Sequence, residues 1–412
     1  MKFLLIILFC IDIVHSGSIL HISDVHIDLE YHEGMPTQCW FGLFNCCHPG
    51  ALPKGRYKPA GYYGSPNCTS PIHLVRDTLT NLKQYFIIHP DQKPQFTLFT
   101  GDAVNNHVTW INPWKSISYI GIFVLLFTPG NHDTWPIDQW SQYNSLITKE
   151  WYKYLQDYIP IDQKELFLKG GYYEYKINNK LKIISINSLY GERRSFILRN
   201  SDAIPMLTWL NSSLLQSRNN REKVYLIYHF GPCDSEITEY LRNRLLYIFD
   251  IYKDIIIASF SGHNHRNDHK LLPPAPSISL YTSYSSFNSN NRGYSFVNYV
   301  ASSLIPTRTD PSFRLYIYNN ITYEIEDSYI FSIDLKNSNK QRKLLFYELL
   351  SLKSYFNLPS LHKNDFILLF NQMKTNITTF NRYISLYYEG QQPMKCKGKC
   401  KQVFIDQLFC KR

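Results

Sequence analysis

The sequence predicts a layered α/β sandwich, and three observations lead to this fold class. Short apolar, β-branched runs recur along the chain, and each ends in a polar cluster, which is typical of strands buried on both faces of a sheet. Helical patterns lie between some of these runs, and this alternation favours helices layered on sheets. The 412 residues are 44% hydrophobic and 18% charged, which excludes a disordered tail protein or a coiled coil. The predicted strands are residues 19–22, 96–99, 122–127, 182–186, 224–228 and 255–259.

The clearest predicted helix follows Ser70 and Pro71, which form an N-cap and first-turn pair. The character of the chain changes after about residue 337, where residues 343–356 and 365–388 both have a helical pattern. One face of the first predicted helix carries the apolar residues Leu74, Leu79, Leu82 and Phe86.

The N-terminus has the pattern of a secretory signal peptide. Lys2 supplies the positive charge, residues 3–11 are an unbroken apolar stretch, and small residues follow. We therefore expect a signal peptide at residues 1–18, a catalytic domain at 19–336 and a C-terminal helical subdomain at 337–412.

Two further patterns agree with secretion. The chain has four N-glycosylation sequons. Eight cysteines remain after the leader is removed, and they cluster near the two ends of the mature chain, with one cysteine between the clusters. In an oxidising compartment such clusters form local disulfides, and the spacings fit none of the usual zinc-finger pairs. No later stretch is long and apolar enough to span a bilayer, so we expect a soluble, secreted chain, with a lysosomal-type compartment as the alternative. The sequon asparagines are Asn67, Asn211, Asn320 and Asn376.

The formal net charge is +10, which favours anionic partners. The positive charges are scattered, and the densest run is short, at residues 395–401. No RNA- or DNA-binding motif accompanies them, so no nucleic-acid-binding module is expected.

Metal-binding side chains follow five of the predicted strands. The carboxyl ends of strands are where α/β sheets place their sites. Residues two apart in an extended chain project to the same side, so Asp24 and His26 would reach one point, as would His263 and His265. Imidazole with carboxylate suits Zn²⁺ or a similar divalent ion. The five motifs are Asp24-Val25-His26, Gly101-Asp102, Gly130-Asn131-His132-Asp133, His229 and Gly262-His263-Asn264-His265.

This ordered set resembles the calcineurin-like metallophosphoesterases. The resemblance implies a four-layer α/β/β/α sandwich with two divalent metal ions, for which the ligands and the family favour zinc. Asp102 would bridge the two ions. By the resemblance, one ion would be held by Asp24, His26 and His265, and the other by Asn131, His229 and His263.

The same resemblance implies the catalytic residues. A hydroxide bridging the metals would attack phosphorus, His132 would be the general acid, and Asp133 would orient it. The stretch from Gly101 to Trp110 resembles acid sphingomyelinase and its secreted relatives, which carry a second catalytic His there. His107 would fill that role, although it lies one residue further from Asp102 than the family pattern predicts.

The resemblance also implies disulfides. It pairs Cys39 with Cys46, Cys47 with Cys68, and Cys396 with Cys400. The family's last disulfide lacks its partner here, so Cys233 and Cys410 are left either free or paired with each other.

The resemblance therefore implies a secreted, metal-dependent phosphodiesterase. Acid sphingomyelinase carries a saposin-like domain that the present chain has no room for before Asp24, so we expect soluble nucleotide-type or choline-phosphate-type substrates. The alternative is a sphingomyelin phosphodiesterase that releases ceramide and phosphocholine, and a non-catalytic secreted binding protein is a minor alternative. A rim made by Trp110, Trp114 and the C-terminal helices would allow peripheral membrane contact. A monomer is favoured.

Overall fold

The computed structural model describes residues 16–40, 46–105, 119, 125–141, 145–275, 293–307, 309–347, 349–389 and 396–411. Two six-stranded sheets form the centre of the molecule, and a two-stranded ribbon lies beside them. The ribbon pairs β2 (Ile27–Asp28) with β3 (Ser70–Pro71). The first sheet has the order β14 (Leu350–Ser351), β13 (Ile325–Ser332), β12 (Ser312–Asn319), β1 (Ser16–Ile22), β4 (Phe96–Phe99) and β5 (Leu125–Phe127). The second has the order β10 (Asp268–Leu271), β11 (Val297–Val300), β9 (Ile256–Ser261), β8 (Lys223–Ile227), β7 (Leu181–Ser185) and β6 (Tyr173–Lys176).

The strands that carry the predicted motifs run parallel to their neighbours. In the first sheet β1 pairs with β4 and β4 with β5, and in the second β7 pairs with β8 and β8 with β9. Parallel strands end at the same edge of a sheet, so their carboxyl-terminal loops meet there. This topology confirms the predicted α/β class.

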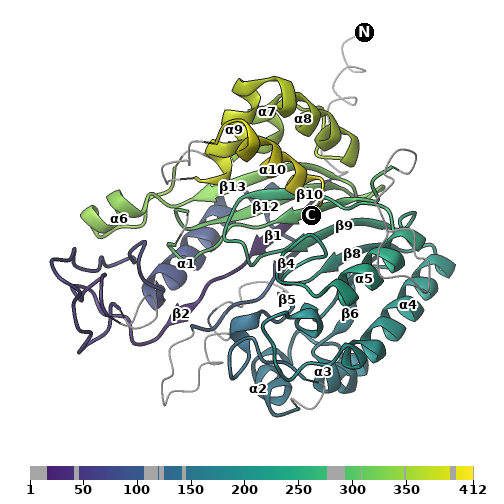
Figure 1. Ribbon diagram of the computed structural model, residues 1–412, viewed down its shortest axis with the longest axis horizontal. Helices are drawn as coiled ribbons and strands as arrows, with labels where there is room; N and C mark the ends of the chain where they lie inside the picture. Colours follow the sequence, from purple (N-terminus) through teal and green to yellow (C-terminus); the bar gives the residue numbers. More distant parts are fainter. Residues whose placement is uncertain are drawn as a thin grey trace, which may run out of the picture.

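Helices cover the sheets (Figure 1). Apolar residues of both sheets, such as Leu98 and Ile227, share one buried cluster, so the two sheets face each other across an apolar layer. The other faces pack against helices, because Leu79 of α1 and Leu245 of α5 are buried with Leu20 and Leu226 in a second cluster. The helices are α1 (Ile72–Ile88), α2 (Ser145–Leu155), α3 (Lys164–Gly170), α4 (Ile204–Asn219), α5 (Glu239–Ile251), α6 (Leu335–Gln341), α7 (Leu352–Phe356), α8 (Lys363–Thr375), α9 (Ile377–Tyr387) and α10 (Lys399–Leu408). Short 3-10 helices are η2 (Pro90–Gln92), η4 (Asn131–Asp133), η5 (Ile161–Gln163), η6 (Ser188–Gly191) and η7 (Asn200–Ala203).

The C-terminal helices gather over one end of the two sheets, where α7 contacts β13 and α10 contacts β10 (Figure 1). The predicted helix at 343–356 is wrong over most of its length. Of its described residues only those of α7 are helical, and Leu350 and Ser351 pair with β13 as an additional strand. The predicted helix at 365–388 is divided into α8 and α9 at Asn376, whose side chain accepts hydrogen bonds from the first turn of α9.

The predicted domain boundary at 336/337 lies inside α6, and β14 beyond it still belongs to the first sheet. The predicted signal peptide overlaps the structure by three residues, since β1 begins at Ser16, and the rest of it lies outside the described residues. The domain boundary and the signal peptide both stay predictions. Among the described residues, no helix is both long and apolar enough to cross a membrane.

Four disulfides cross-link the described part of the chain. Two of them build the cystine-rich segment near the N-terminus, one joins Cys396 to the first turn of α10, and the fourth joins two segments that are 177 residues apart. The last of these answers the question that the sequence left open, because Cys233 is paired with Cys410. The pairs are Cys39–Cys46, Cys47–Cys68, Cys396–Cys400 and Cys233–Cys410.

The sequon asparagines lie on the surface of the molecule. Asn67, Asn211 and Asn376 are exposed, and Asn320 is partly exposed. The positions are therefore accessible, and their glycosylation stays a prediction.

Candidate metal centre

The predicted ligands lie in loops at the carboxyl ends of β1, β4, β5, β8 and β9. Backbone hydrogen bonds tie these loops to one another. The amide of Asp24 donates to the carbonyl of Gly101 over 3.0 Å, and the amide of Gly262 donates to the carbonyl of His229 over 2.9 Å. These backbone bonds tie the loop after β1 to the loop after β4, and the loop after β8 to the loop after β9.

Five of the seven predicted ligands adopt a left-handed backbone conformation. Such a conformation is uncommon for residues other than glycine, and it is found at sites where the surrounding structure enforces it. The extended conformation expected from the sequence is therefore wrong at these residues. His263 and His265, which were expected to reach one point, lie in different ligand groups. The φ angles are +49° for Asp24, +46° for His26, +59° for Asp102, +73° for His263 and +53° for His265.

The first ligand group consists of Asp24, His26 and His265. Their ligand atoms lie within 4.8 Å of one another. His265 Nε2 lies 3.3 Å from Asp24 Oδ1 and 3.3 Å from His26 Nε2. Two imidazole nitrogens and one carboxylate oxygen thus converge on one point.

The second ligand group consists of Asp102, His229 and His263, with Asn131 beside it. His229 Nε2 lies 3.2 Å from Asp102 Oδ2, 3.2 Å from His263 Nδ1 and 2.9 Å from Asn131 Oδ1. His229 Nδ1 contacts the carbonyl of Thr100 at 2.7 Å. This contact directs Nε2 toward the group, as is common for metal-binding imidazoles.

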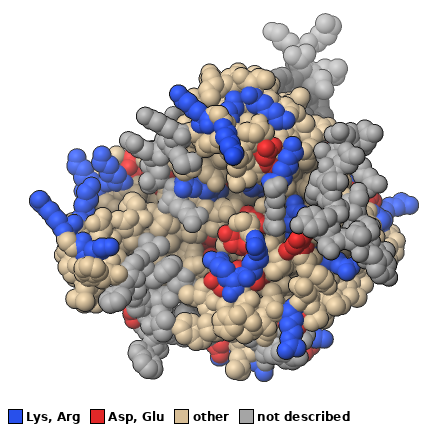
Figure 2. All heavy atoms as spheres, in the orientation of Figure 1, with Lys and Arg blue, Asp and Glu red and all other residues tan. Residues whose placement is uncertain are grey.

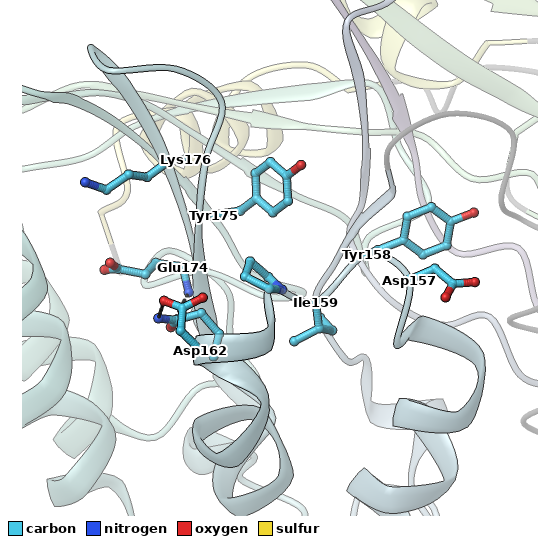
Figure 3. Close-up of a pocket in the computed structure, with 9 residues that line it drawn as sticks. Asp157, Tyr158, Ile159, Asp162, Glu174, Tyr175 and Lys176 are labelled. Atoms are coloured by element: carbon cyan, nitrogen blue, oxygen red, sulfur yellow. Dashed lines mark hydrogen bonds between the residues drawn. The ribbon is translucent and has the colours of Figure 1, made fainter.

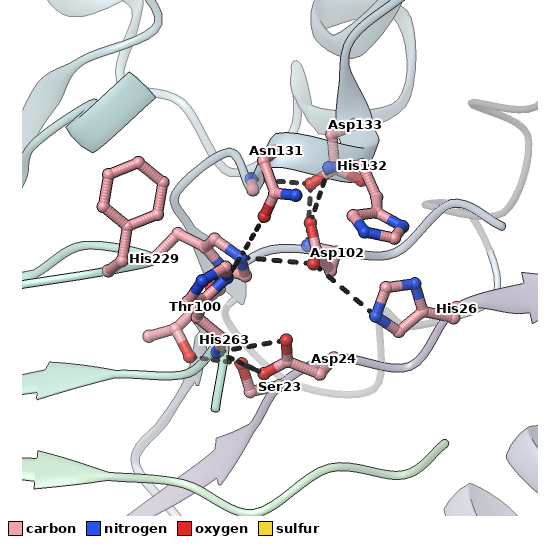
Figure 4. A network of polar contacts seen from close by, with 12 residues as sticks. Ser23, Asp24, His26, Thr100, Asp102, Asn131, His132, Asp133, His229 and His263 are labelled. Atoms are coloured by element: carbon pink, nitrogen blue, oxygen red, sulfur yellow. Dashed lines mark hydrogen bonds and ion pairs between the residues drawn. The ribbon is translucent and has the colours of Figure 1, made fainter. Parts of the chain in front are cut away.

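Asp102 connects the two groups (Figure 4). Its Oδ2 lies 3.5 Å from His26 Nε2 in the first group and 3.2 Å from His229 Nε2 in the second. Its Oδ1 accepts a hydrogen bond from the amide of His132 over 2.9 Å. The carboxylate is therefore placed where a bridging ligand would stand.

The ionisation of the cluster follows from burial and from its mutual charges. Burial raises the pKa of Asp102, but His229 and His132 outweigh it and the pKa falls well below its ordinary value. The pKa of Asp24 is lowered in the same way, because His265 and His229 outweigh burial. Burial lowers the pKa of His26 to about 4. Burial also lowers that of His229, but Asp102 outweighs it and raises the pKa to about 10.

The donor set fits a pair of divalent cations. Two buried carboxylates and four imidazoles meet in two groups, and within each group imidazole nitrogens face each other at 3.2–3.3 Å. When these rings are neutral their lone pairs point at a common centre, which suits a cation that takes nitrogen and oxygen ligands.

His132 and Asp133 lie beside the bridging position. The His132 ring packs edge-on against His26, with ring centroids 4.4 Å apart, and burial holds its pKa well below the ordinary value. Asp133 accepts hydrogen bonds from the backbone amides of Asp102, Ala103, Val104 and Gly130, so it joins the loops after β4 and β5. Burial and the Asp102 charge raise its pKa to about 7. An orienting contact from Asp133 to the His132 ring stays a prediction.

Three residues singled out from the sequence, His107, Trp110 and Trp114, lie outside the described residues. Two others that the sequence did not suggest support the ligand loops. Asp138 Oδ1 accepts from Asn131 Nδ2 over 2.8 Å, and Asp234 Oδ1 accepts from Asn264 Nδ2 over 2.8 Å. No motif marks either aspartate, because each reaches its partner across a turn or between loops.

Charge on the face shown in Figure 2 is mixed. Lys and Arg side chains are spread over this face, while Asp and Glu side chains gather near its middle. On this face the described residues form no continuous basic stripe.

A separate groove of about 470 Å³ lies between the end of α2, the turn at η5 and strand β6 (Figure 3). Its walls include Asp162, Glu174 and Lys176, and none of the predicted ligands lines it. The groove is therefore no part of the metal centre.

A family model confirms the resemblance. The description "Calcineurin-like phosphoesterase" matches residues 17–267, which include every predicted ligand. The chain belongs to the calcineurin-like phosphoesterase family.

Curated relatives extend the match over nearly the whole chain. It is 26% identical to "Sphingomyelin phosphodiesterase A" of Dictyostelium discoideum, over 95% of this chain and 66% of that protein. It is 27% identical to "Cyclic GMP-AMP phosphodiesterase SMPDL3A" of Bos taurus, over 93% of this chain and 86% of that protein. The chain thus spans about two thirds of the length of the first relative.

Proposed function

We propose that this member of the family is a secreted phosphodiesterase that hydrolyses soluble nucleotide-type or choline-phosphate-type substrates at a dinuclear metal centre. One observation carries the proposal. Two convergent ligand groups share the buried carboxylate of Asp102, whose Oδ2 lies within 3.5 Å of imidazoles from both groups. A shared carboxylate of this kind suits two ions held close together, as two-metal phosphoesterases require.

The ligand assignment follows the two groups. Asp24, His26 and His265 would hold one ion, and Asn131, His229 and His263 the other, with Asp102 between them. Two divalent ions, for which the nitrogen and oxygen ligands favour zinc, supply Lewis acidity toward phosphoryl oxygens and make water a better nucleophile at neutral pH.

His132 would donate a proton to the leaving oxygen. Its backbone amide is fixed on Asp102 Oδ1, so the ring stands beside the bridging carboxylate and against His26. Burial favours the neutral ring. The negative charge of a bound phosphodiester favours the protonated ring, so substrate binding would itself prepare the proton donor. His107 would be the second acid.

The relatives support two substrate classes. The relative named a cyclic GMP-AMP phosphodiesterase is matched over 86% of its length, which supports a soluble nucleotide-type substrate. The relative named a sphingomyelin phosphodiesterase supports the alternative, release of ceramide and phosphocholine from sphingomyelin. Four disulfides support an oxidising, extracellular compartment.

A turnover screen tests the proposal. Purified zinc-loaded protein is assayed at acidic and neutral pH with bis(p-nitrophenyl) phosphate, ATP, CDP-choline and sphingomyelin in detergent micelles. Turnover of the soluble compounds but not of sphingomyelin is the expected result. Strong sphingomyelin cleavage would favour the lipid-directed alternative. No turnover with two ions bound would favour a binding protein.

A further inference from the structure

We propose that Asp138 is a positioning residue that turns the amide oxygen of Asn131 toward the second ligand group. The inference rests on the proposed function, which makes Asn131 a ligand. Asn131 has an oxygen and an NH₂ group at the same end of its side chain, and only the oxygen can bind a cation. Something in the protein must therefore select one of the two orientations.

The contacts of Asn131 select the orientation that binds. Its Nδ2 donates to Asp138 Oδ1 over 2.8 Å, while its Oδ1 lies 2.9 Å from His229 Nε2. An ionised carboxylate accepts hydrogen bonds and cannot donate them. Asp138 therefore accepts only the NH₂ side of Asn131, which leaves the oxygen to face His229 and the ligand group (Figure 4).

The backbone brings Asp138 back to Asn131. The amide of Asp138 donates to the carbonyl of Asn131 over 3.1 Å, and the hydroxyl of Thr134 donates to the same carbonyl over 2.9 Å. Asp138 has φ of +63°, a left-handed conformation that aspartate and asparagine tolerate better than most residues. The turn after η4 thus returns the carboxylate to the ligand that it orients.

Arg194 contacts the same carboxylate oxygen of Asp138 that accepts from Asn131. Its Nη2 lies 3.2 Å from Asp138 Oδ1, and its Nε lies 3.1 Å from Oε1 of the buried Glu192. The Asp138 side chain is 18% exposed and that of Arg194 is 50% exposed, so the carboxylate is largely buried while the guanidinium is partly open to solvent. Glu192, Arg194, Asp138 and Asn131 form a continuous polar chain from a buried carboxylate to the ligand.

The experiment measures metal affinity rather than turnover. Zn²⁺ and Co²⁺ are titrated into metal-free wild-type protein, Asp138→Gly and Asp138→Asn, with Co²⁺ followed by its absorption spectrum. Glycine and asparagine both accept the left-handed backbone, so the two variants differ in the hydrogen-bond acceptor. Asp138→Gly should bind one of the two ions about 10–100-fold more weakly, as loss of an outer partner of a ligand typically does. Asp138→Asn should bind closer to wild type, since its side-chain oxygen can accept from Asn131.

Two further variants keep the result interpretable. Asp254 pairs with Arg218 just before β9 begins, at the edge opposite the metal centre, so Asp254→Ala should bind both ions like wild type. Arg194→Ala should weaken the same ion as Asp138→Gly but by a smaller factor, and it serves as the test if metal-free Asp138→Gly fails to fold. Unchanged affinity for both ions in Asp138→Gly overturns the inference, as do equal losses in Asp138→Gly and Asp138→Asn. Fewer than two ions bound by wild type would instead overturn the proposed function.

Discussion

His132 is the residue whose proposed role separates chemistry from metal binding most clearly. A ring nitrogen of His132 lies within 4.8 Å of ligand atoms of His26 and Asp102, yet the proposed assignment leaves it outside the two groups that hold the ions. His132→Ala should lower turnover by about 10²–10⁴-fold, the usual contribution of general acid catalysis, while leaving two ions bound. Steady-state kinetics together with metal analysis checks both statements. Unchanged turnover would refute the assigned role, and loss of an ion would make His132 a ligand.

Asp310 gives a pH dependence of stability. Burial raises its pKa from an ordinary value of 3.8 to about 6, although Tyr347 donates a hydrogen bond to it. A raised pKa means that the folded protein prefers the protonated form, so this group's stabilisation is present below about pH 4 and is lost as the pH rises to about 6.

The substitution Asp310→Asn should remove that dependence. In the presence of a chelator, the thermal midpoint of the variant minus that of wild type should increase between about pH 4 and pH 6 and then stay level. The exposed Asp91, replaced by Asn, provides the baseline. A difference that stays constant over this range would contradict the expectation.

At the scale of elements, the disulfide between Cys233 and Cys410 should matter more than the one between Cys396 and Cys400. The first closes a loop of 177 residues and the second a loop of 4. Chain entropy then predicts that losing the long-range link costs about 5 kcal/mol and losing the short one about 2 kcal/mol. The double serine variants of the two pairs are compared by chemical denaturation. Equal losses of unfolding free energy would contradict this account.

Some strands of the two sheets could be predicted from the sequence and others could not. The parallel central strands were predictable because they are continuous apolar runs. Strand β12 was not, because it contains Arg314, which is buried where its guanidinium contacts Asn267 and His269. The short strand β14 was mistaken for a helix, because its pairing with β13 depends on a tertiary contact that overrides local periodicity.

Some residues of the metal centre could likewise be predicted from the sequence, and others could not. Its ligands were predictable because they directly follow strands, where the topology itself brings them together. Asp138 and Asp234 were not, because their roles depend on a returning turn and on the contact between two loops. The left-handed backbone at the ligands was also hidden, since nothing in the motifs distinguishes it from an extended chain.

At the scale of the whole molecule, the metal centre joins the two sheets. Asp24 and Asp102 follow strands of the first sheet, while His229 and His263 follow strands of the second. His229 contacts Asp102 and His263 contacts Asp24, so the ligand groups lie across the junction of the sheets. Ions bound there would add a link between two sheets that also meet through apolar packing and through hydrogen bonds, such as that from Ser185 Oγ to the carbonyl of Phe127.

Metal removal should therefore destabilise the whole fold. A ligand that binds only the folded state adds about 2.7 kcal/mol when its concentration is 100 times its dissociation constant. Treatment with a chelator should lower the thermal midpoint, and readdition of Zn²⁺ should restore it. The variant Asp102→Ala removes the shared carboxylate and should lose most of this metal-dependent shift, whereas His132→Ala should retain it. A midpoint that is the same with and without metal in wild type would mean that the centre does not link the sheets, even if the ions support turnover.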